Sequence, residues 1–180
     1  RRFLRANGRY LLSVLLSVAL TVVLLVLPLD YAALGKFGYL GIIVTSVLAN
    51  ATVVFPAPTL AAAWIGGTFL APPLVGLAAG FGSTVGEMTG YLAGYGGSAL
   101  AARSRYYEPI RRFVGRFGVL AIIVLAIIPN PLFDLAGIAA GAMRIPVWVF
   151  LLACFVGKTV RYILIAYLGR WGGTDWLPWL

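Results

Sequence analysis

Histidine is absent from the chain, and Cys154 is its single cysteine. Without histidine, neither imidazole acid–base catalysis nor a histidine-ligated metal site is available. One cysteine cannot form an intrachain disulfide or a cysteine metal cluster, and no serine stands in a nucleophile elbow. The sequence therefore predicts a protein that is not an enzyme and that holds neither a metal ion nor another cofactor.

Charge is scarce as well: 11% of the 180 residues are charged, whereas 62% are hydrophobic. A soluble domain is about half apolar and about one quarter charged, and a chain of this length cannot hide the surplus in one water-soluble core. Apolar runs recur along the whole length, so the sequence predicts one all-α integral membrane domain over residues 1–180. The net charge of +9 is interleaved with these runs, which favours membrane topology and anionic lipid headgroups over nucleic acid.

The apolar runs are of two kinds. Two of them, residues 38–71 and 117–143, are broken in the middle by a Pro-x-Pro motif, which a helix cannot continue. A segment with five arginines, residues 103–116, separates the two halves and is typical of an interfacial connector. The other runs are long enough, at about 1.5 Å per residue, to cross a hydrocarbon core of about 30 Å. These predicted transmembrane helices are residues 10–29, 74–100 and 147–168.

The two halves of the chain repeat one pattern. The Pro-x-Pro motif of residues 55–58 recurs at residues 128–131, an offset of 73, and the Gly-Glu of residues 86–87 is matched by the Gly-Lys of residues 157–158, an offset of 71. Each half thus reads as an apolar arm, a break, a second arm and a long helix that carries charge. Chance recurrence of proline and glycine in membrane sequence is the alternative. The predicted tips of the two broken segments are Pro56, Pro58, Pro129 and Pro131.

The basic residues discriminate between two topologies. If residues 38–55 crossed the membrane as one helix, the connector would lie on the side opposite the arginines of residues 1–9. That arrangement breaks the rule that loops rich in lysine and arginine face the cytoplasm. If both broken segments are re-entrant hairpins, ten basic residues share one side: those of residues 1–9, those of the connector, and Arg144. The other side then holds only Lys36 and Arg170.

The second topology is the one we predict. It is an inverted repeat of a re-entrant helical hairpin plus a transmembrane helix, with an extra transmembrane helix at the N-terminus. Hairpin tips that enter from opposite faces meet near the middle of the membrane, where non-helical backbone must be buried in protein or face water. Broken helices within inverted repeats are a transporter device. We expect a prokaryotic plasma membrane, with the N-terminus and residues 103–116 in the cytoplasm.

Charged residues within the apolar segments form the candidate site. A lone charge at the bilayer centre costs about 2.5–3.5 kcal/mol on insertion scales, so retained charges usually pair or face a wet cavity. Lys158 and Arg161 are three residues apart and share one helix face, and the repeat predicts that Glu87 lies close to them. Such a basic pair can hold an anionic phosphate. The candidate substrate-binding residues are Glu87, Asn130, Asp134, Arg144, Lys158 and Arg161.

Each candidate also has a structural interpretation. The four charges at positions 87, 134, 158 and 161 can form a salt-bridge network that only locks the helices together. Asn130 can cap the arm that follows it, and Arg144 can extend to the membrane interface. We expect Tyr91 and Tyr162 to make hydrogen bonds within the bundle. Glycines at short spacing permit close contact between helices, and we assign packing to Gly86, Gly90, Gly94, Gly97, Gly137 and Gly141.

Four motifs across residues 38–170 stand together in one order. They are Phe55-Pro-x-Pro, Gly86-Glu-x-x-Gly-Tyr-x-x-Gly94, Pro129-Asn-Pro-Leu-Phe-Asp-Leu-Ala-Gly-Ile138 with Gly141, and Gly157-Lys158. The chain thereby resembles the DedA/VTT family of membrane proteins, also called SNARE-associated proteins. Its second half is especially similar to the vacuole membrane protein type of that family. Many bacterial members have Gly-Glu after Pro-x-Pro, whereas Thr59 follows Pro58 here, so the first hairpin lacks that carboxylate.

The resemblance implies lipid translocation. Eukaryotic relatives act as phospholipid scramblases, and some bacterial relatives recycle a phosphorylated polyprenyl carrier lipid with proton coupling. Carried over by position, Asp134, Lys158 and Arg161 are the strongest functional candidates, followed by Glu87. We expect a scramblase or lipid-phosphate translocase whose partners are membrane lipids with an anionic or phosphate headgroup. A small-solute or ion transporter of the same architecture and a structural assembly protein are the alternatives, and a homo-oligomer stays open.

Overall fold

The computed structural model describes residues 38–51, 57–96, 107–129 and 133–172, and every regular element within them is an α-helix. The prediction of an all-helical chain is thereby confirmed for these residues. The predicted transmembrane helix of residues 10–29 lies outside them. The helices are α2 (Gly38–Ala51), α3 (Ala57–Phe69), α4 (Pro72–Tyr95), α5 (Tyr107–Phe117), α6 (Val119–Ile127), α7 (Phe133–Ala142) and α8 (Val147–Gly172).

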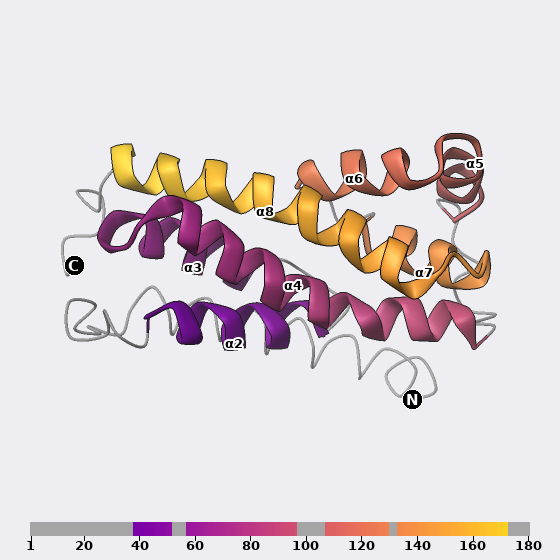
Figure 1. The fold of residues 1–180 in the computed structure, drawn as a ribbon, viewed down its shortest axis with the longest axis horizontal. Coiled ribbons are helices and arrows are strands. Elements are labelled where there is room, and N and C mark those ends of the chain that lie inside the picture. Colours follow the sequence, from indigo (N-terminus) through magenta and orange to yellow (C-terminus); the bar gives the residue numbers. More distant parts are fainter. Residues whose placement is uncertain (1–37, 52–56, 97–106, 130–132, 173–180) are drawn as a thin grey trace, which may run out of the picture.

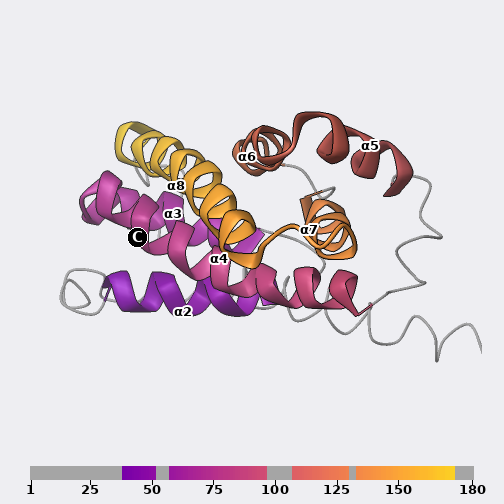
Figure 2. The ribbon, with the colours of Figure 1, turned by 45° about the vertical axis from the view of Figure 1, so that its right-hand side comes forward.

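Two long helices, α4 and α8, pack against each other at the centre, and the shorter helices lie against them in matching pairs (Figure 1). α2 lies against α4, as α6 lies against α8. The second arms exchange partners, because α3 lies against α8 and α7 lies against α4. Figure 2 shows the same arrangement after a turn about the vertical axis, with α5 and α6 apart from α2. The two halves of the chain therefore make corresponding contacts with each other's long helix.

The helix boundaries follow local chemistry. α4 begins at Pro72, two residues before the predicted start, because a proline in the first turn gives up no intrahelical hydrogen bond. Ala71 before it is extended, with φ −69° and ψ 115°, as the residue before a proline prefers. α8 continues to Gly172, four residues past the predicted end. α5 occupies most of the predicted basic connector.

α8 is the helix, within the described part of the chain, that is both long and apolar enough to cross a membrane. An 18-residue stretch of it has a mean hydropathy of 1.9, and its 26 residues extend about 39 Å at 1.5 Å per residue. α4 has 24 residues, about 36 Å, and carries Glu87 among glycine and hydroxyl residues. The lengths of both helices match the thickness of a bilayer.

The outer surface of the bundle is apolar along these two helices. Exposed large side chains recur every three or four residues, which places them on one face of each helix. On α4 they include Leu74, Leu77, Phe81 and Val85, and on α8 they include Trp148, Leu152, Val156, Val160 and Leu164. Three charged side chains of these helices, Glu87, Lys158 and Arg161, are buried instead, which is rare in soluble proteins unless the charges are paired. The chain is a helical membrane protein with exposed apolar stripes on α4 and α8.

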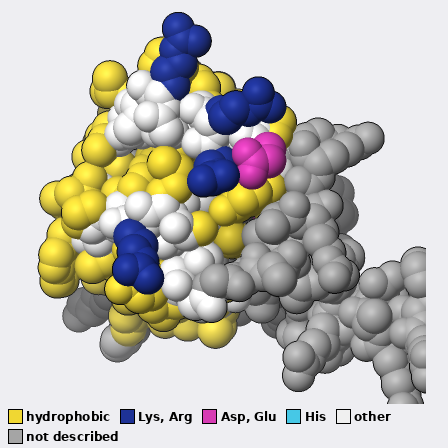
Figure 3. Space-filling view, turned by 90° about the vertical axis from the view of Figure 1, so that its right-hand side faces the viewer, with side chains coloured by type: hydrophobic (Ala, Val, Ile, Leu, Met, Phe, Trp, Pro, Cys, Tyr) yellow, Lys and Arg dark blue, Asp and Glu magenta, His cyan; other side chains and the backbone are white. Residues whose placement is uncertain are grey.

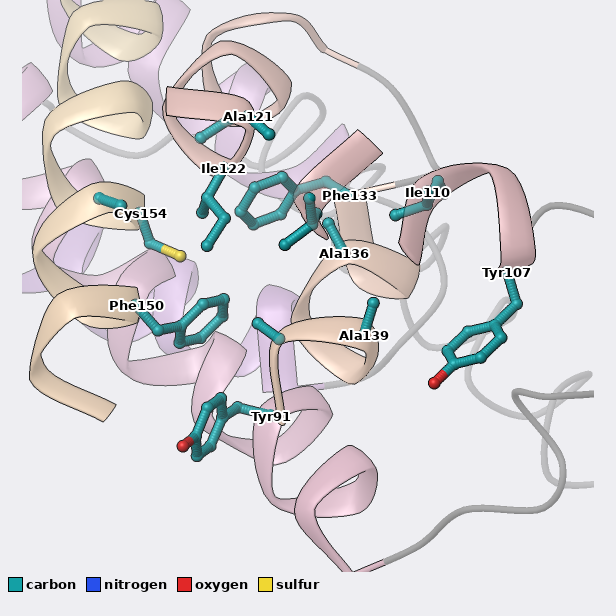
Figure 4. Packing of buried hydrophobic residues seen from close by; sticks show 14 residues of the cluster. Tyr91, Tyr107, Ile110, Ala121, Ile122, Phe133, Ala136, Ala139, Phe150 and Cys154 are labelled. Atoms are coloured by element: carbon teal, nitrogen blue, oxygen red, sulfur yellow. The ribbon is translucent and has the colours of Figure 1, made fainter. Parts of the chain in front are cut away.

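One apolar cluster holds α7 against its neighbours (Figure 4). Phe133 at the start of α7 lies beside Ile122 of α6, and Cys154 of α8 belongs to the same cluster. Further along, Phe150 of α8 stacks on Tyr91 of α4, with the ring centroids 5.1 Å apart. The cluster therefore fixes the position of the first turn of α7 between α6, α4 and α8.

The crossing of α4 and α7 depends on two glycines. A Cβ atom on Gly94 would fall on the carbonyl oxygen of Ile138, and one on Gly141 would fall on the carbonyl oxygen of Tyr91. Each helix thus approaches the backbone of the other at a glycine, as small residues permit in membrane bundles.

The other glycines assigned to packing have different surroundings. A Cβ atom on Gly86 would lie 2.7 Å from the Cβ atom of Asn50, so α2 and α4 are in close contact there. On Gly90 and Gly137 the nearest atoms would be 3.8 and 3.5 Å away, which is ordinary contact distance. Close approach therefore requires glycine at Gly86 and not at these two positions. Gly97 lies outside the described residues.

Candidate functional site

Glu87 of α4 and Lys158 of α8 form an ion pair where the two long helices pack. Lys158 Nζ lies 2.6 Å from Glu87 Oε1, and the two side chains are 1% and 3% exposed. The prediction from the repeat, that these opposite charges meet, is confirmed. Removing two charges from water is costly, and their mutual attraction compensates only when further hydrogen bonds satisfy the remaining protons and lone pairs.

Asn50 supplies such hydrogen bonds. Its Oδ1 accepts a hydrogen bond from Lys158 Nζ at 2.9 Å, and its Nδ2 donates to the hydroxyls of Thr59 and Ser83, each at 3.1 Å. One amide thus connects α2 to α3, α4 and α8. Sequence reasoning missed this residue, although an amide in the apolar run of residues 38–55 is a signal that could have found it.

Arg161 lies one helical turn after Lys158 on α8 and is 4% exposed. Its Nη2 donates a hydrogen bond to the hydroxyl of Tyr162 at 3.0 Å, and that hydroxyl also accepts one from Ser83 at 3.0 Å. Arg161 Nε has no hydrogen-bond partner among the described residues, and neither salt bridge found among them includes this guanidinium. Because a guanidinium has five N–H donors, Arg161 retains capacity to bind an anion.

Asp134 lies in the first turn of α7 and is half-buried. Its carboxylate is close enough to Glu87, Lys158 and Arg161 to interact electrostatically with all three. The preceding side chain also reaches the ion pair, because Lys158 Nζ is 5.0 Å from the ring centroid of Phe133. The structure therefore brings together the four charged candidates, two carboxylates and two cations, around the first turn of α7.

Arg144 lies elsewhere. It is exposed in the turn between α7 and α8, and its guanidinium Cζ is 5.7 Å from the ring centroid of Tyr95. α7 separates it from Asp134, and its 10 residues extend about 15 Å. The structure therefore does not bring Arg144 to the buried charges, and its exposed position agrees with the interfacial interpretation.

The predicted tips are only partly described. Pro58 is fully buried in the first turn of α3, whereas Pro129 is exposed just after α6. Pro56, Asn130 and Pro131 lie outside the described residues.

The family model described as VTT domain matches residues 42–171, which include every described element except the first turn of α2 and the last residue of α8. The vacuole membrane protein 1 homolog of Dictyostelium discoideum is 46% identical over 56 residues, or 31% of this chain and 14% of that protein.

Two further relatives are of the same type. Vacuole membrane protein 1 of Homo sapiens is 41% identical over 63 residues, which is 35% of this chain and 16% of that protein. Vacuole membrane protein KMS1 of Arabidopsis thaliana is 56% identical over 39 residues, or 22% of this chain and 9% of that protein. The matched segments therefore cover less than one fifth of each relative. No solved structure matches the chain.

Proposed function

The chain belongs to the VTT domain family, and from that premise we propose that it moves lipids across the bilayer by passing their headgroups through the polar interior. The observation that carries this proposal is a buried cation with a donor that no described residue accepts. Arg161 is inside the bundle, its Nε lacks a partner among the described residues, and a guanidinium matches a phosphate group in a bidentate manner. No covalent chemistry is needed for this activity.

We further propose that α2–α3 and α6–α7 are re-entrant hairpins related by an inverted repeat. The exchanged contacts of α3 with α8 and of α7 with α4 support this relation. So does the meeting of both second arms at one cation. Lys158 donates a hydrogen bond to Asn50, which donates one to Thr59 in the first turn of α3. Lys158 also faces the ring of Phe133 in the first turn of α7. Mirrored hairpins would bring these first turns together near mid-membrane.

The apolar stripes on α4 and α8 favour a lipid over a soluble substrate. A lipid keeps its tails in hydrocarbon, so a path for it can lie along a lipid-facing surface, whereas a path for an ion or a soluble solute must be closed off from the tails. The alternative transporter therefore requires an enclosed pathway through the bundle. A purely structural role is favoured by one observation, the complete pairing of Lys158 with Glu87 and Asn50.

We propose that the side of the membrane occupied by α5 is cytoplasmic, because exposed arginines concentrate on that helix. The expectation of a prokaryotic plasma membrane stays a prediction. The relatives described above are eukaryotic, and their names assign them to vacuole membranes.

Reconstitution into liposomes tests the function. Purified protein is expected to move fluorescent phospholipid or labelled polyprenyl phosphate from the inner to the outer leaflet faster than protein-free liposomes do. Soluble glycerophosphate trapped in the same liposomes should stay inside, because the path serves a headgroup whose tails remain in lipid. If folded protein moves neither lipid, the proposal fails, and release of glycerophosphate would favour the solute transporter. Equal rates of lipid movement at two pH values would exclude proton coupling and favour a scramblase over a proton-coupled translocase.

A further inference from the structure

α5 has an orientation that distinguishes it from the other helices. In Figure 1 it is seen nearly end-on, while α6 and α8 run across the view, so α5 runs across one end of the bundle. The chain turns from α5 into α6 at Gly118, whose φ of +57° is a conformation that favours glycine. A helix across the end of a membrane bundle lies in the plane of the interface rather than through the hydrocarbon.

The two faces of α5 differ in chemistry. Tyr107, Ile110 and Val114 are buried in the apolar cluster beside α7. The opposite face exposes three arginines together with two aromatic rings that are 37% and 48% exposed. The exposed set is Arg111, Arg112, Phe113, Arg116 and Phe117. Alternating cations and aromatic rings suit a surface where phosphate groups and acyl chains meet.

Arg144 adds a fourth cation to this end of the bundle, because the residue before it, Met143, lies beside Gly115 of α5 and Arg144 itself is exposed. Figure 3 views this end directly and shows basic side chains spread across it, with one acidic group among them. Glu108 of α5 pairs with Arg111 at 3.3 Å while both side chains remain more than half exposed. The pair leaves the other three arginines without a carboxylate partner among the described residues. The surface formed by Arg111, Arg112, Arg116 and Arg144 is called the basic end below.

We propose that the basic end is a second lipid site, which binds the phosphate headgroups of anionic phospholipids in the adjoining leaflet. Exposed guanidinium groups bind phosphate bidentately, and each basic residue near an anionic membrane surface contributes about 1 kcal/mol of attraction. This site is separate from the interior, where Arg161 is buried. It also gives Arg144 a ligand, although Arg144 is remote from the buried charges. Because α5 packs on α7, headgroups held here fix the arm that carries Asp134.

Lipid titration of the purified protein in detergent micelles tests this site, with fluorescent phosphatidylglycerol as the probe. Wild type is expected to bind phosphatidylglycerol more tightly than phosphatidylcholine. Replacing Arg112 and Arg116 together by glutamine should weaken phosphatidylglycerol binding about thirtyfold, since each cation contributes roughly fivefold. Replacing both by lysine keeps the charge but loses the bidentate geometry, so it should weaken binding less than glutamine does without restoring the affinity of wild type. Arg170→Gln is the matched control, because Arg170 is an exposed arginine on α8, and it should have little effect.

Three outcomes would overturn the proposal: equal affinity of wild type for the two lipids, equal losses in the Arg112/Arg116 and Arg170 variants, or displacement of the probe by inorganic phosphate alone. The last result would assign the site to free phosphate rather than to a lipid. The test is independent of the proposed translocation. Arg161→Ala should leave binding at the basic end unchanged, and loss of transport in that variant would concern only the interior path.

Discussion

At the scale of single residues, the described part of the chain contains two buried cations with different surroundings. Lys158 is bonded to Glu87 and Asn50, whereas Arg161 is bonded through Nη2 to Tyr162 and leaves Nε without a described partner. Burial makes an unpaired charge costly, so the first arrangement suits a lock between helices and the second suits a ligand site. These two roles are separable by mutation.

Breaking the ion pair is expected to destabilise the protein. Lys158→Met leaves Glu87 buried without its cation, and removing one partner of a buried pair costs about 3–5 kcal/mol. The thermal unfolding temperature in detergent should fall strongly for Lys158→Met and for Glu87→Gln. The double variant should be less destabilised than the sum of the single variants, since neither charge is then left alone. Additive losses would show that the two side chains do not stabilise each other.

Asn50 is expected to contribute as a polar junction. Asn50→Leu removes an acceptor from Lys158 and donors to two hydroxyls, and leaving a buried partner unsatisfied costs about 1–3 kcal/mol. Thermal unfolding of this variant is compared with that of Ser46→Ala, one turn earlier on the same helix. Ser46 is fully buried and its hydroxyl has no hydrogen-bond partner in the described structure, so its loss should be neutral. Equal effects of the two substitutions would contradict the role of Asn50.

At the scale of elements, the approach of α4 and α7 determines where Asp134 lies. Gly94→Ala would place a methyl group on the Ile138 carbonyl, so the helices would have to separate, at a cost of about 1–3 kcal/mol. Gly90→Ala is the matched control on the same helix, because its Cβ would have 3.8 Å of clearance. We expect lower thermal stability for Gly94→Ala and near wild-type stability for Gly90→Ala. The reverse order would mean that α4 and α7 do not cross as described.

The sequence predicted the positions of the helices better than the contacts and orientations of individual residues and helices. Proline positions separated α2 from α3 and α6 from α7, and the repeat offset predicted that Glu87 meets Lys158. Both predicted tyrosines form hydrogen bonds, as with Tyr91 and the carbonyl oxygen of Ile145 at 2.6 Å. The repeat offset of 73 residues matches Asn50 to Ile123, which is apolar. The repeat therefore did not indicate that Asn50 would bind Lys158. Periodicity within α5 also does not specify its orientation, which depends on contacts with α7.

At the scale of the whole molecule, a polar interior is enclosed by a bundle whose long helices present apolar stripes to lipid. Ser83, Glu87, Lys158 and Arg161 are all buried, while the stripes on α4 and α8 require contact with hydrocarbon. In the proposed function, fixed polar groups of this interior replace the water that a charged headgroup loses, which lowers the cost of its passage through the membrane. In that proposal Arg161 receives the headgroup.

The initial rate of phospholipid flipping in proteoliposomes tests that claim most directly. It is measured for wild type, Arg161→Ala and Arg170→Ala at equal amounts of folded protein. We predict that Arg161→Ala slows flipping by at least roughly tenfold, because a hydrogen bond to a charged group contributes about 1.5–3 kcal/mol. The exposed Arg170 should be dispensable for flipping. An Arg161→Ala protein that remains folded and flips lipid at the wild-type rate would contradict the account.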